Sequence, residues 1–437
     1  MTRSESGTPG SLSRRQFLQR SGAAAIAAPA LSLTRSVHAA GSDIIRVGLV
    51  GCGGRGTGAA AQAMQADPGV RLVAMADVFA NRVQGSRNAL KQQRPEQTLV
   101  DDDHCFAGLD AYKQVVEAVD VVLIANAAKF HPVQMAAAIE AGKHVFVEKP
   151  HAIDPAGIHV VAGACELAKQ KKLGVLSGLH SRFQANIRET VRRIHDGQIG
   201  EIVAIEENFL RGPYGNTTRS PNMTELENQY ANQYRFSWLC GDDVTQSLVH
   251  NLDRATWALG ETPPVRCHGL GGRSGAQNLL GDVFDNHSVV YHYANGVRMY
   301  ALCRTALNCY GEYSSIVMGS KGIAFPMEGR ITGETPWRFE GSVPNPHQAE
   351  QTEFFASLRE GKPLHCGDYM SRSTLVAIMG QLSCYSGKEI SWEQASKSDY
   401  FLPPAAAACT WDMAPPTQPD ENGVYPVCAV PGFTTNA

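Results

Sequence analysis

Two polar motifs contain the residues best suited to catalysis, and the first is a lysine at the end of a predicted strand. Lys149 lies between Glu148 and Pro150, directly after the apolar run of residues 144–147. The carboxyl ends of parallel strands open onto the ligand crevice of α/β folds, where a lysine can hold a substrate hydroxyl and assist proton transfer. Taken alone, Glu-Lys-Pro is also typical of a solvated turn.

The second motif is a polar stripe on a predicted helix, residues 245–259. Apolar side chains at helical spacing form one face of this helix, at Leu248, Leu252, Ala255 and Leu259. The opposite face carries an amide, an imidazole, a carboxylate and an indole, at Gln246, His250, Asp253 and Trp257. By itself such a stripe is more typical of a face exposed to solvent, but it also suits the lining of a polyol pocket.

Nucleotide binding is indicated by a glycine-rich loop, Gly51-x-Gly53-x-x-Gly56, between an apolar run and an alanine-rich segment. In a dinucleotide fingerprint the first glycine permits a tight turn, the second lets the pyrophosphate approach the backbone, and the third lets helix and strand pack closely. The helix N-terminus then favours the phosphate charge. Gly54 and Arg55 complete the loop, and we expect all five residues to contact the cofactor.

A carboxylate follows the loop at a suitable distance. Asp77 comes directly after the predicted strand of residues 70–76 and lies 21 residues beyond Gly56. A carboxylate at this position accepts hydrogen bonds from both ribose hydroxyls and repels a 2′-phosphate, which predicts NAD as the cofactor. Arg82 can still reach a 2′-phosphate, so NADP stays as the less favoured alternative. Another interpretation is a glycine turn in an unrelated α/β protein, with the aspartate capping a helix.

The elements that must position these motifs alternate between strand and helix up to residue 150. We expect strands at residues 44–50, 70–76, 119–125 and 144–147, and helices at 57–66, 81–93 and 136–141. This alternation predicts an α/β domain with a doubly wound parallel sheet of the Rossmann type. Residues 42–150 are therefore assigned to a nucleotide-binding domain.

Beyond residue 150 the pattern changes. A further helix is expected at residues 155–171, and apolar and polar residues then alternate with period two at 202–209, 288–293, 297–303 and 313–318. Such alternation is typical of half-exposed antiparallel strands, so residues 151–400 are predicted to form a substrate-binding α+β domain with an open, largely antiparallel sheet. Residues 401–437, rich in proline and alanine, are expected to form an irregular tail.

The first 39 residues resemble a twin-arginine export signal. Ser13-Arg14-Arg15-Gln16-Phe17-Leu18 precedes a weakly apolar stretch at residues 22–33, and Val37-His38-Ala39 offers small residues for cleavage. The stretch is too short to span a bilayer, which needs about 20 apolar residues. We expect a periplasmic or otherwise exported protein that engages the twin-arginine translocon, with a disordered basic N-terminus as the alternative.

Composition excludes several classes of function. The chain has 437 residues, 43% of them hydrophobic and 19% charged, which is ordinary for a globular protein. Removal of the signal, with its five arginines and one glutamate, takes the formal net charge from −3 to −7 and argues against nucleic-acid binding. The eleven cysteines are irregularly spaced, so we expect free thiols and no metal site.

Taken together, these motifs resemble those of the glucose–fructose oxidoreductase and inositol dehydrogenase (Gfo/Idh/MocA) family. The resemblance runs from about residue 44 to residue 391 and includes Gly197-Gln198-Ile199-Gly200, which opens the second domain's sheet in that family. It implies that Lys149 is catalytic and that His250 is an acid/base. It further implies cofactor contacts from Asn126, His131 and Glu148, and substrate contacts from His180, Arg182, Gln246 and Asp253. A structural hydrogen-bond donor is the equally favoured alternative for His180 and for Arg182.

The chain departs from the family pattern at two places. Sugar and inositol dehydrogenases of the family usually carry an aspartate four residues before the histidine, where this chain has Gln246, which cannot act as a base. The usual Pro-Asn near the nicotinamide is Ala127-Ala128. Proton transfer is therefore assigned to His250, Lys149 or a tyrosine among Tyr214, Tyr230 and Tyr234.

Three functions remain open from the sequence. The first is an oxidoreductase that acts on a CH–OH group of a sugar, glycoside or polyol, with a tightly bound cofactor that is reset within each cycle. The second is an NAD-dependent glycosidase, in which transient oxidation allows elimination of the glycosidic bond. The third is a nucleotide-binding protein without catalysis. Family members often pair through the open sheet, so a homo-dimer or homo-tetramer is expected.

Overall fold

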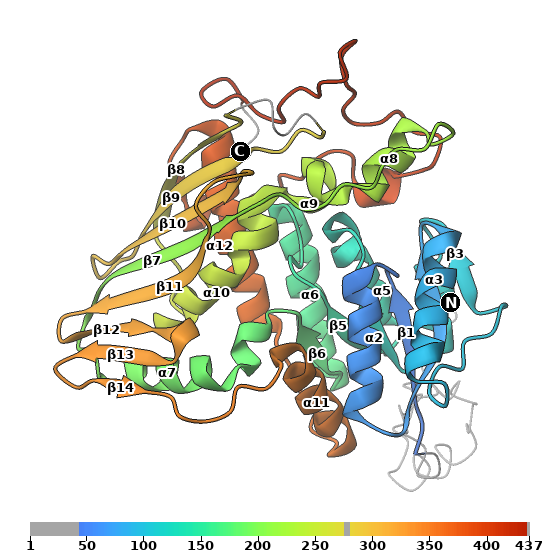
Figure 1. The fold of residues 1–437 in the computed structure, drawn as a ribbon, viewed down its shortest axis with the longest axis horizontal. Coiled ribbons are helices and arrows are strands. Elements are labelled where there is room, and N and C mark those ends of the chain that lie inside the picture. The colour runs from blue at the N-terminus through green and yellow to red at the C-terminus, as the bar shows by residue number, and fades with distance from the viewer. Residues whose placement is uncertain (1–42, 275–279, 435–437) are drawn as a thin grey trace, which may run out of the picture. The chain divides into compact units, whose positions relative to one another are not determined.

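The computed structural model describes residues 43–274 and 280–434 (Figure 1). The predicted export signal, residues 1–39, lies outside this part of the chain. Six parallel strands form the first sheet, in the order β3-β2-β1-β4-β5-β6. Their bounds are β1 Ile45–Val50, β2 Val70–Asp77, β3 Cys105–Ala107, β4 Val121–Ile124, β5 His144–Val147 and β6 Val175–Ser177.

Helices cover this sheet and explain its apolar strands. Strands β4 and β5 are buried along their whole length, as expected where helices lie on both faces of a parallel sheet. The helices of this part are α2 Gly54–Ala66, α3 Ala80–Gln93, α4 Tyr112–Ala118, α5 His131–Glu140 and α6 Pro155–Lys171. The predicted doubly wound Rossmann sheet is thereby confirmed.

The first sheet also contains elements that the sequence did not predict. Strand β6 lies beyond residue 150, where the domain was expected to end, and it pairs with β5. Strands β3 and β6 have only three residues each, too few for a period-two pattern to be detected. Helix α2 begins at Gly54, so the second half of the glycine loop is already helical.

The second sheet has nine strands in the order β14-β13-β12-β11-β7-β10-β9-β8-β15. Only the β7–β10 pair is parallel, which confirms the open, largely antiparallel sheet. The strands are β7 Ile202–Arg211, β8 Arg266–Gly272, β9 Asn286–His292, β10 Arg298–Thr305, β11 Glu312–Gly319, β12 Gly322–Phe325, β13 Arg330–Gly333, β14 Trp337–Arg338 and β15 Ile390–Ser391.

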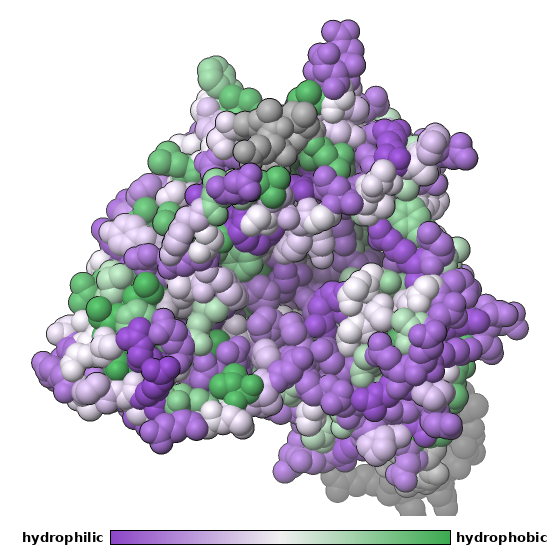
Figure 2. Space-filling model, in the orientation of Figure 1, coloured by the Kyte–Doolittle hydropathy of each residue, from purple (hydrophilic) through white to green (hydrophobic). Residues whose placement is uncertain are grey.

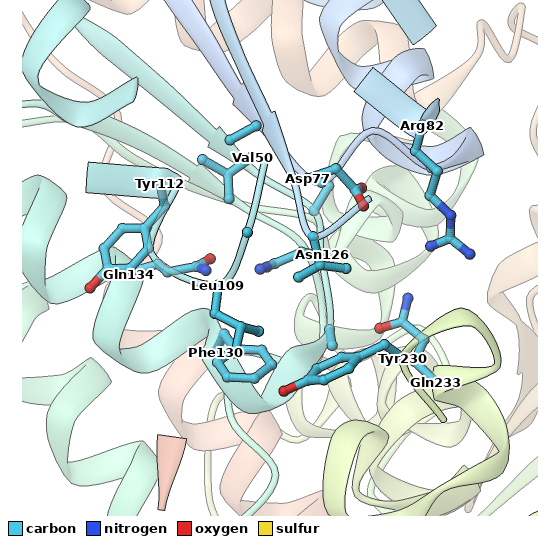
Figure 3. Close-up of a pocket in the computed structure, with 17 residues that line it drawn as sticks. Val50, Asp77, Arg82, Leu109, Tyr112, Asn126, Phe130, Gln134, Tyr230 and Gln233 are labelled. Carbon is cyan, nitrogen blue, oxygen red and sulfur yellow. The ribbon is translucent and has the colours of Figure 1, made fainter. Parts of the chain in front are cut away.

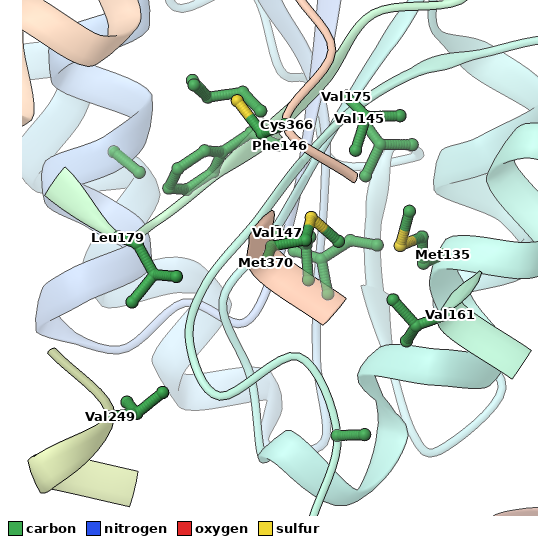
Figure 4. Packing of buried hydrophobic residues seen from close by; sticks show 14 of the residues in the cluster. Met135, Val145, Phe146, Val147, Val161, Val175, Leu179, Val249, Cys366 and Met370 are labelled. Carbon is green, nitrogen blue, oxygen red and sulfur yellow. The ribbon is translucent and has the colours of Figure 1, made fainter. Parts of the chain in front are cut away.

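Helices cover one face of the second sheet and join it to the first domain. Helix α10 packs on β7 and β11, whereas α12 packs on β8 and also on α6 (Figure 1). Side chains of α12, including Met370, share one hydrophobic cluster with those of β5, such as Phe146 (Figure 4). The helices are α7 Ala185–His195, α8 Glu225–Ala231, α9 Ser237–Cys240, α10 Val249–Ala258, α11 Pro346–Arg359, α12 Gly367–Ser386 and α13 Trp392–Lys397.

The predicted helix of residues 245–259 is not a single α-helix. Its first turn, Val244–Leu248, is π-helical, and α10 follows it. Single π-turns are frequent at functional sites. Beyond residue 398 the described chain is irregular except for one 3₁₀ turn, Ala406–Ala408.

Two further properties of the described part bear on the sequence analysis. All eleven cysteines lie within it and are free thiols. No helix in residues 43–274 or 280–434 has the length and apolar character needed to cross a membrane.

Candidate active site

The glycine loop between β1 and α2 has the geometry of a nucleotide cradle. Gly51 adopts φ = 98°, and a Cβ there would lie 2.5 Å from the backbone nitrogen of Asn126. A Cβ on Gly56 would lie 1.9 Å from the carbonyl oxygen of Gly51, so only glycine allows α2 to pack this closely. A Cβ on Gly53 or Gly54 would meet nothing within 4 Å, which leaves the loop open to a ligand.

Asp77 lies beside this loop at the end of β2. Its Oδ2 accepts a hydrogen bond from the Cys52 amide at 2.8 Å, and its Oδ1 accepts one from the Phe79 amide at 3.0 Å. These bonds fix the carboxylate on the wall of a cavity (Figure 3), which is lined by Gly51, Gly53, Asp77, Arg82, Asn126, Phe130, Tyr230 and Gln233 among others. We call this the nucleotide cavity.

Arg82 is the residue that left NADP as an alternative cofactor, and its guanidinium already contacts other parts of the protein. Its guanidinium donates to the carbonyl oxygen of Ala231 at 3.2 Å and lies 4.9 Å from the centre of the Phe79 ring. Asp77, by contrast, presents a fixed negative charge at the cavity wall. The open cradle and this carboxylate fit NAD, whose ribose hydroxyls would bind Asp77 and whose pyrophosphate would lie at the N-terminus of α2.

A second cavity of about 230 Å³, the catalytic cavity, adjoins the first. The two share Ala125, Asn126 and Gln233 in their linings, so they lie side by side. Figure 2 shows a hollow with a mostly hydrophilic surface on this face of the molecule. The catalytic cavity is lined by Arg55, Asn126, Glu148, Lys149, Pro150, His180, Tyr214, Gln233, Tyr234, Cys240, Gln246, His250 and His347, among others.

Lys149 is held at the end of β5 by the segment that carries the second motif. Its ammonium donates a hydrogen bond to the Gln246 carbonyl oxygen at 2.7 Å, and the Lys149–Pro150 peptide bond is cis. Neighbouring Glu148 is buried and lies 3.2 Å from the Arg55 Nε. Burial raises the pKa of the Glu148 carboxyl, and the charges of Arg55 and Lys149 oppose this effect.

Three histidines meet in the catalytic cavity. The His180 ring centre lies 4.8 Å from that of His250 and 4.3 Å from that of His347. Burial lowers the pKa of His180 to about 3 and that of His347 to about 4. Burial, followed by the charge of Lys149, lowers the pKa of His250 well below its usual range. The three imidazoles are therefore neutral near pH 7 and can accept hydrogen bonds, and burial also makes them weaker bases than an exposed histidine.

Gln246 faces the cavity from the π-helical turn. Its Oε1 accepts hydrogen bonds from the Ser247 hydroxyl at 2.7 Å and from the Tyr214 hydroxyl at 3.4 Å. The Tyr214 ring stacks on that of Tyr234, with centres 4.5 Å apart. Of the three tyrosines left open by the sequence, Tyr214 and Tyr234 line the catalytic cavity, whereas Tyr230 lines the nucleotide cavity.

Arg182 and Asp253 do not reach either cavity. The Arg182 guanidinium donates to Asp253 Oδ1 at 2.8 Å and also pairs with Glu261, while Asp253 accepts a further bond from the Ser373 hydroxyl at 2.8 Å. Asp253 is fully buried, and a buried carboxylate requires such partners. The structure therefore places these two residues in a buried ion pair outside the linings of both cavities.

Three other predicted residues act behind the cavity walls. His131 lies with Nδ1 2.7 Å from the Pro150 carbonyl oxygen and Nε2 3.2 Å from that of Asn126, so it holds two wall segments together. Gly54 and Gly56 shape the loop without lining either cavity. Sequence reasoning missed His347, Cys240 and Gln233, because nothing in their local patterns sets them apart.

A nucleotide cavity that adjoins the catalytic cavity on a Rossmann fold is the architecture of a dinucleotide-dependent oxidoreductase. Family models agree: residues 45–177 match the GFO_IDH_MocA oxidoreductase family, NAD-binding Rossmann fold, and residues 191–372 match its C-terminal alpha/beta domain. The chain belongs to this oxidoreductase family, and its Rossmann domain binds NAD.

Curated relatives are similar over part of their length. Residues of this chain are 29% identical over 171 positions to glycosyl hydrolase family 109 protein 1 of Bacteroides fragilis, covering 38% of this chain and 35% of that protein. They are 28% identical over 219 positions to inositol 2-dehydrogenase 4 of Saccharopolyspora erythraea, covering 50% and 54%. The match thus spans about a third to a half of these relatives.

Solved structures share the fold. An aldose-aldose oxidoreductase from Caulobacter crescentus, complexed with glycerol, aligns with a TM-score of 0.60 at 17% identity, covering 80% of this chain and 99% of that one. A myo-inositol 2-dehydrogenase from Lactobacillus plantarum aligns with a TM-score of 0.60 at 20% identity and the same coverage. At these identities the likeness establishes the architecture alone.

Proposed function

We propose that this protein oxidises a CH–OH group of a sugar, glycoside or polyol with a tightly bound NAD, and that a second acceptor molecule takes the hydride back within the same cycle. The main support for this proposal is the position of Lys149 and His250. Both line the catalytic cavity, which shares three lining residues with the nucleotide cavity. A sensor without catalysis has no need of a lysine and a neutral imidazole at this junction.

The charge and position of each residue in the catalytic cavity determine its proposed role. NAD, when bound, supplies the hydride acceptor. Lys149 donates a hydrogen bond to a substrate hydroxyl, and His250, neutral because of its burial, accepts the hydroxyl proton. Gln246 has no acid–base capacity and instead orients Tyr214 through the hydrogen bond at 3.4 Å. Glu148 balances the charge of Arg55 in the wall of the catalytic cavity.

Glycoside cleavage is the second candidate, and two observations favour it. Several curated relatives are named glycosyl hydrolase family 109 protein. The catalytic cavity is also lined by two tyrosines, Tyr214 and Tyr234, in addition to His250, and a tyrosine hydroxyl could make a second proton transfer. Oxidation to a ketone would acidify the neighbouring C–H, a base would remove that proton, the glycosidic oxygen would leave, water would add, and reduction would restore the alcohol.

We also propose that the protein is exported through the twin-arginine translocon to the periplasm with NAD already bound. The proposal rests on the motif in residues 1–39 and on the scarcity of free nicotinamide nucleotides outside the cytoplasm. A nucleotide that cannot be replaced must be reset in each cycle, which favours a redox-neutral reaction.

Pairing of two or four copies through the second sheet is a further part of the proposal. Two large apolar side chains of β10, Tyr300 and Leu302, are exposed and alternate with buried neighbours, so they lie on the sheet face opposite the covering helices. Contiguous apolar surface of this kind marks association sites. The acidic formal charge, in contrast, offers no surface for nucleic acid.

Mass spectrometry of sugar, polyol and glycoside mixtures tests the proposed function. The protein, purified from its native compartment with its own nucleotide, should convert at least one carbohydrate class, and Lys149→Ala should convert none. Products of changed oxidation state indicate a dehydrogenase or transhydrogenase, and hydrolysed glycosides indicate the second candidate. Absence of any conversion across neutral sugars, polyols and glycosides would contradict both.

A further inference from the structure

The irregular C-terminal segment, residues 398–434, is anchored to the wall of the active site. The Leu402 amide donates a hydrogen bond to Asp154 Oδ2 at 3.0 Å, and the buried Lys129 ammonium donates to the Leu402 carbonyl oxygen. The Ala156 amide donates to the Tyr400 carbonyl oxygen at 3.1 Å. Lys129 belongs to the 3₁₀ turn Ala128–Phe130, whose ends line the two cavities, so the segment is tied to the Rossmann domain beside them.

The same segment then crosses helix α8. The side-chain amide of Gln229 donates a hydrogen bond to the Thr417 carbonyl oxygen at 2.7 Å, and the Tyr425 hydroxyl donates to Glu225 Oε1 at 2.6 Å. Helix α8 has seven residues, too few for a helix to be stable by itself in water. Its position therefore depends on the chain that crosses it.

Trp411 joins the segment to the nucleotide cavity. Its ring centre lies 5.3 Å from that of Tyr230 and 6.2 Å from that of Phe79. Tyr230 is the residue of α8 that lines the nucleotide cavity (Figure 3), and Phe79 follows Asp77 by two positions. Cys409, Met413 and Tyr425 pack in the same hydrophobic cluster. Trp411 thus connects the ribose side of the cavity to α8 from outside.

We propose that residues 400–425 form a strap that holds α8 and Tyr230 over the ribose end of the nucleotide cavity and slows the release of NAD. Trp411 is its positioning residue, because its ring contacts Tyr230, which lines the cavity, and Phe79, which follows the lining residues Asp77 and Val78, without lining the cavity itself. Arg82 strengthens the closure from the Rossmann side by its hydrogen bond to the Ala231 carbonyl oxygen. The inference rests on the proposed retention of NAD and names the part of the chain that provides it.

Exchange of labelled NAD from the full-length protein tests the strap. Protein loaded with radiolabelled NAD is mixed with excess unlabelled NAD, and retained label is followed with time. Trp411→Ala should release label about tenfold faster, the scale expected for loss of two aromatic contacts. Phe433→Ala, which removes an 83% exposed ring from the same tail, should release it at the wild-type rate.

A conservative variant and hydrogen exchange complete the test. Trp411→Phe retains part of the ring contact and should show a smaller acceleration, which applies even if Trp411→Ala fails to fold. Amides of α8 should exchange faster in the variants while those of β4 and β5 do not. Release from both Trp411 variants at the wild-type rate would overturn the strap alone. Loss of label from the wild-type protein within the mixing time would overturn both the strap and the proposed retention.

Discussion

The nucleotide cavity and the catalytic cavity are neighbours, but they are encoded in opposite ways. The glycine loop and the carboxylate of the nucleotide cavity come from neighbouring parts of one strand–helix–strand unit, residues 51–56 and Asp77. The catalytic cavity takes its polar groups from distant segments, at Lys149, His180, Gln246 and His347. The first depends on backbone geometry and the second on tertiary packing, so substitutions in the two should have separable effects.

The largest expected effect is on catalysis without cofactor binding. Lys149→Ala should lower turnover by ~10²–10⁴-fold, the usual cost of losing one positioned proton-transfer group, while NAD stays bound. Bound NAD is measured in the supernatant after denaturation, beside a steady-state assay. Lys362→Ala, at an exposed position, serves as the control. Loss of NAD with activity restored on reloading would assign Lys149 to the nucleotide cavity.

The second effect is on stability and concerns the ion pair between Arg182 and Asp253, two residues that the sequence analysis assigned to substrate binding. Arg182→Met leaves Asp253 buried without its main partner and should lower the free energy of unfolding by about 3–5 kcal/mol. Chemical denaturation measures this loss. At a temperature where the variant is folded, its KM should match that of the wild type. A raised KM with unchanged stability would return Arg182 to the substrate site.

The third effect distinguishes two glycines, Gly53 directly before α2 and Gly85 within α3. A Cβ on Gly53 enters the open cradle without meeting the protein, so Gly53→Ala should fold normally and bind NAD at least about tenfold more weakly, or about 1.4 kcal/mol. Gly85→Ala, in α3, also meets nothing and should leave NAD affinity unchanged. Titration of nucleotide-free protein gives both affinities. Equal affinities in the two variants would show that the pyrophosphate does not approach Gly53.

The smallest effect is on the pH profile. An ordinary histidine, with a pKa near ~6.5, would lose activity below about pH 6. The pKa of His250 is instead lowered well below its usual range, so the neutral, proton-accepting form persists as pH falls through 6. The rate should stay nearly constant between about pH 6 and 7 and decline only at lower pH. His250→Asn should be inactive throughout while retaining NAD. An acid limb near pH 6.5 in the wild-type rate would contradict the buried imidazole.

The sequence predicted the nucleotide site better than the catalytic site for a physical reason. Gly51, Gly56 and Asp77 act through backbone turns and a strand end, which local pattern encodes. His347 comes from α11 and meets His180 only after the domains fold, and no local signal marks it. Likewise, the partner of Asp253 is Arg182, 71 positions earlier, so periodicity placed the carboxylate on the correct helix face but not against its partner.

The central claim is that NAD stays bound and is reset in each cycle. Absorbance of reduced nicotinamide is followed while substrate turns over in the presence of excess NAD. We expect a transient of less than one equivalent per active site, followed by continued product formation without further reduced nucleotide. Steady accumulation of free NADH over many turnovers would make the protein an ordinary dehydrogenase and would contradict the retention of NAD.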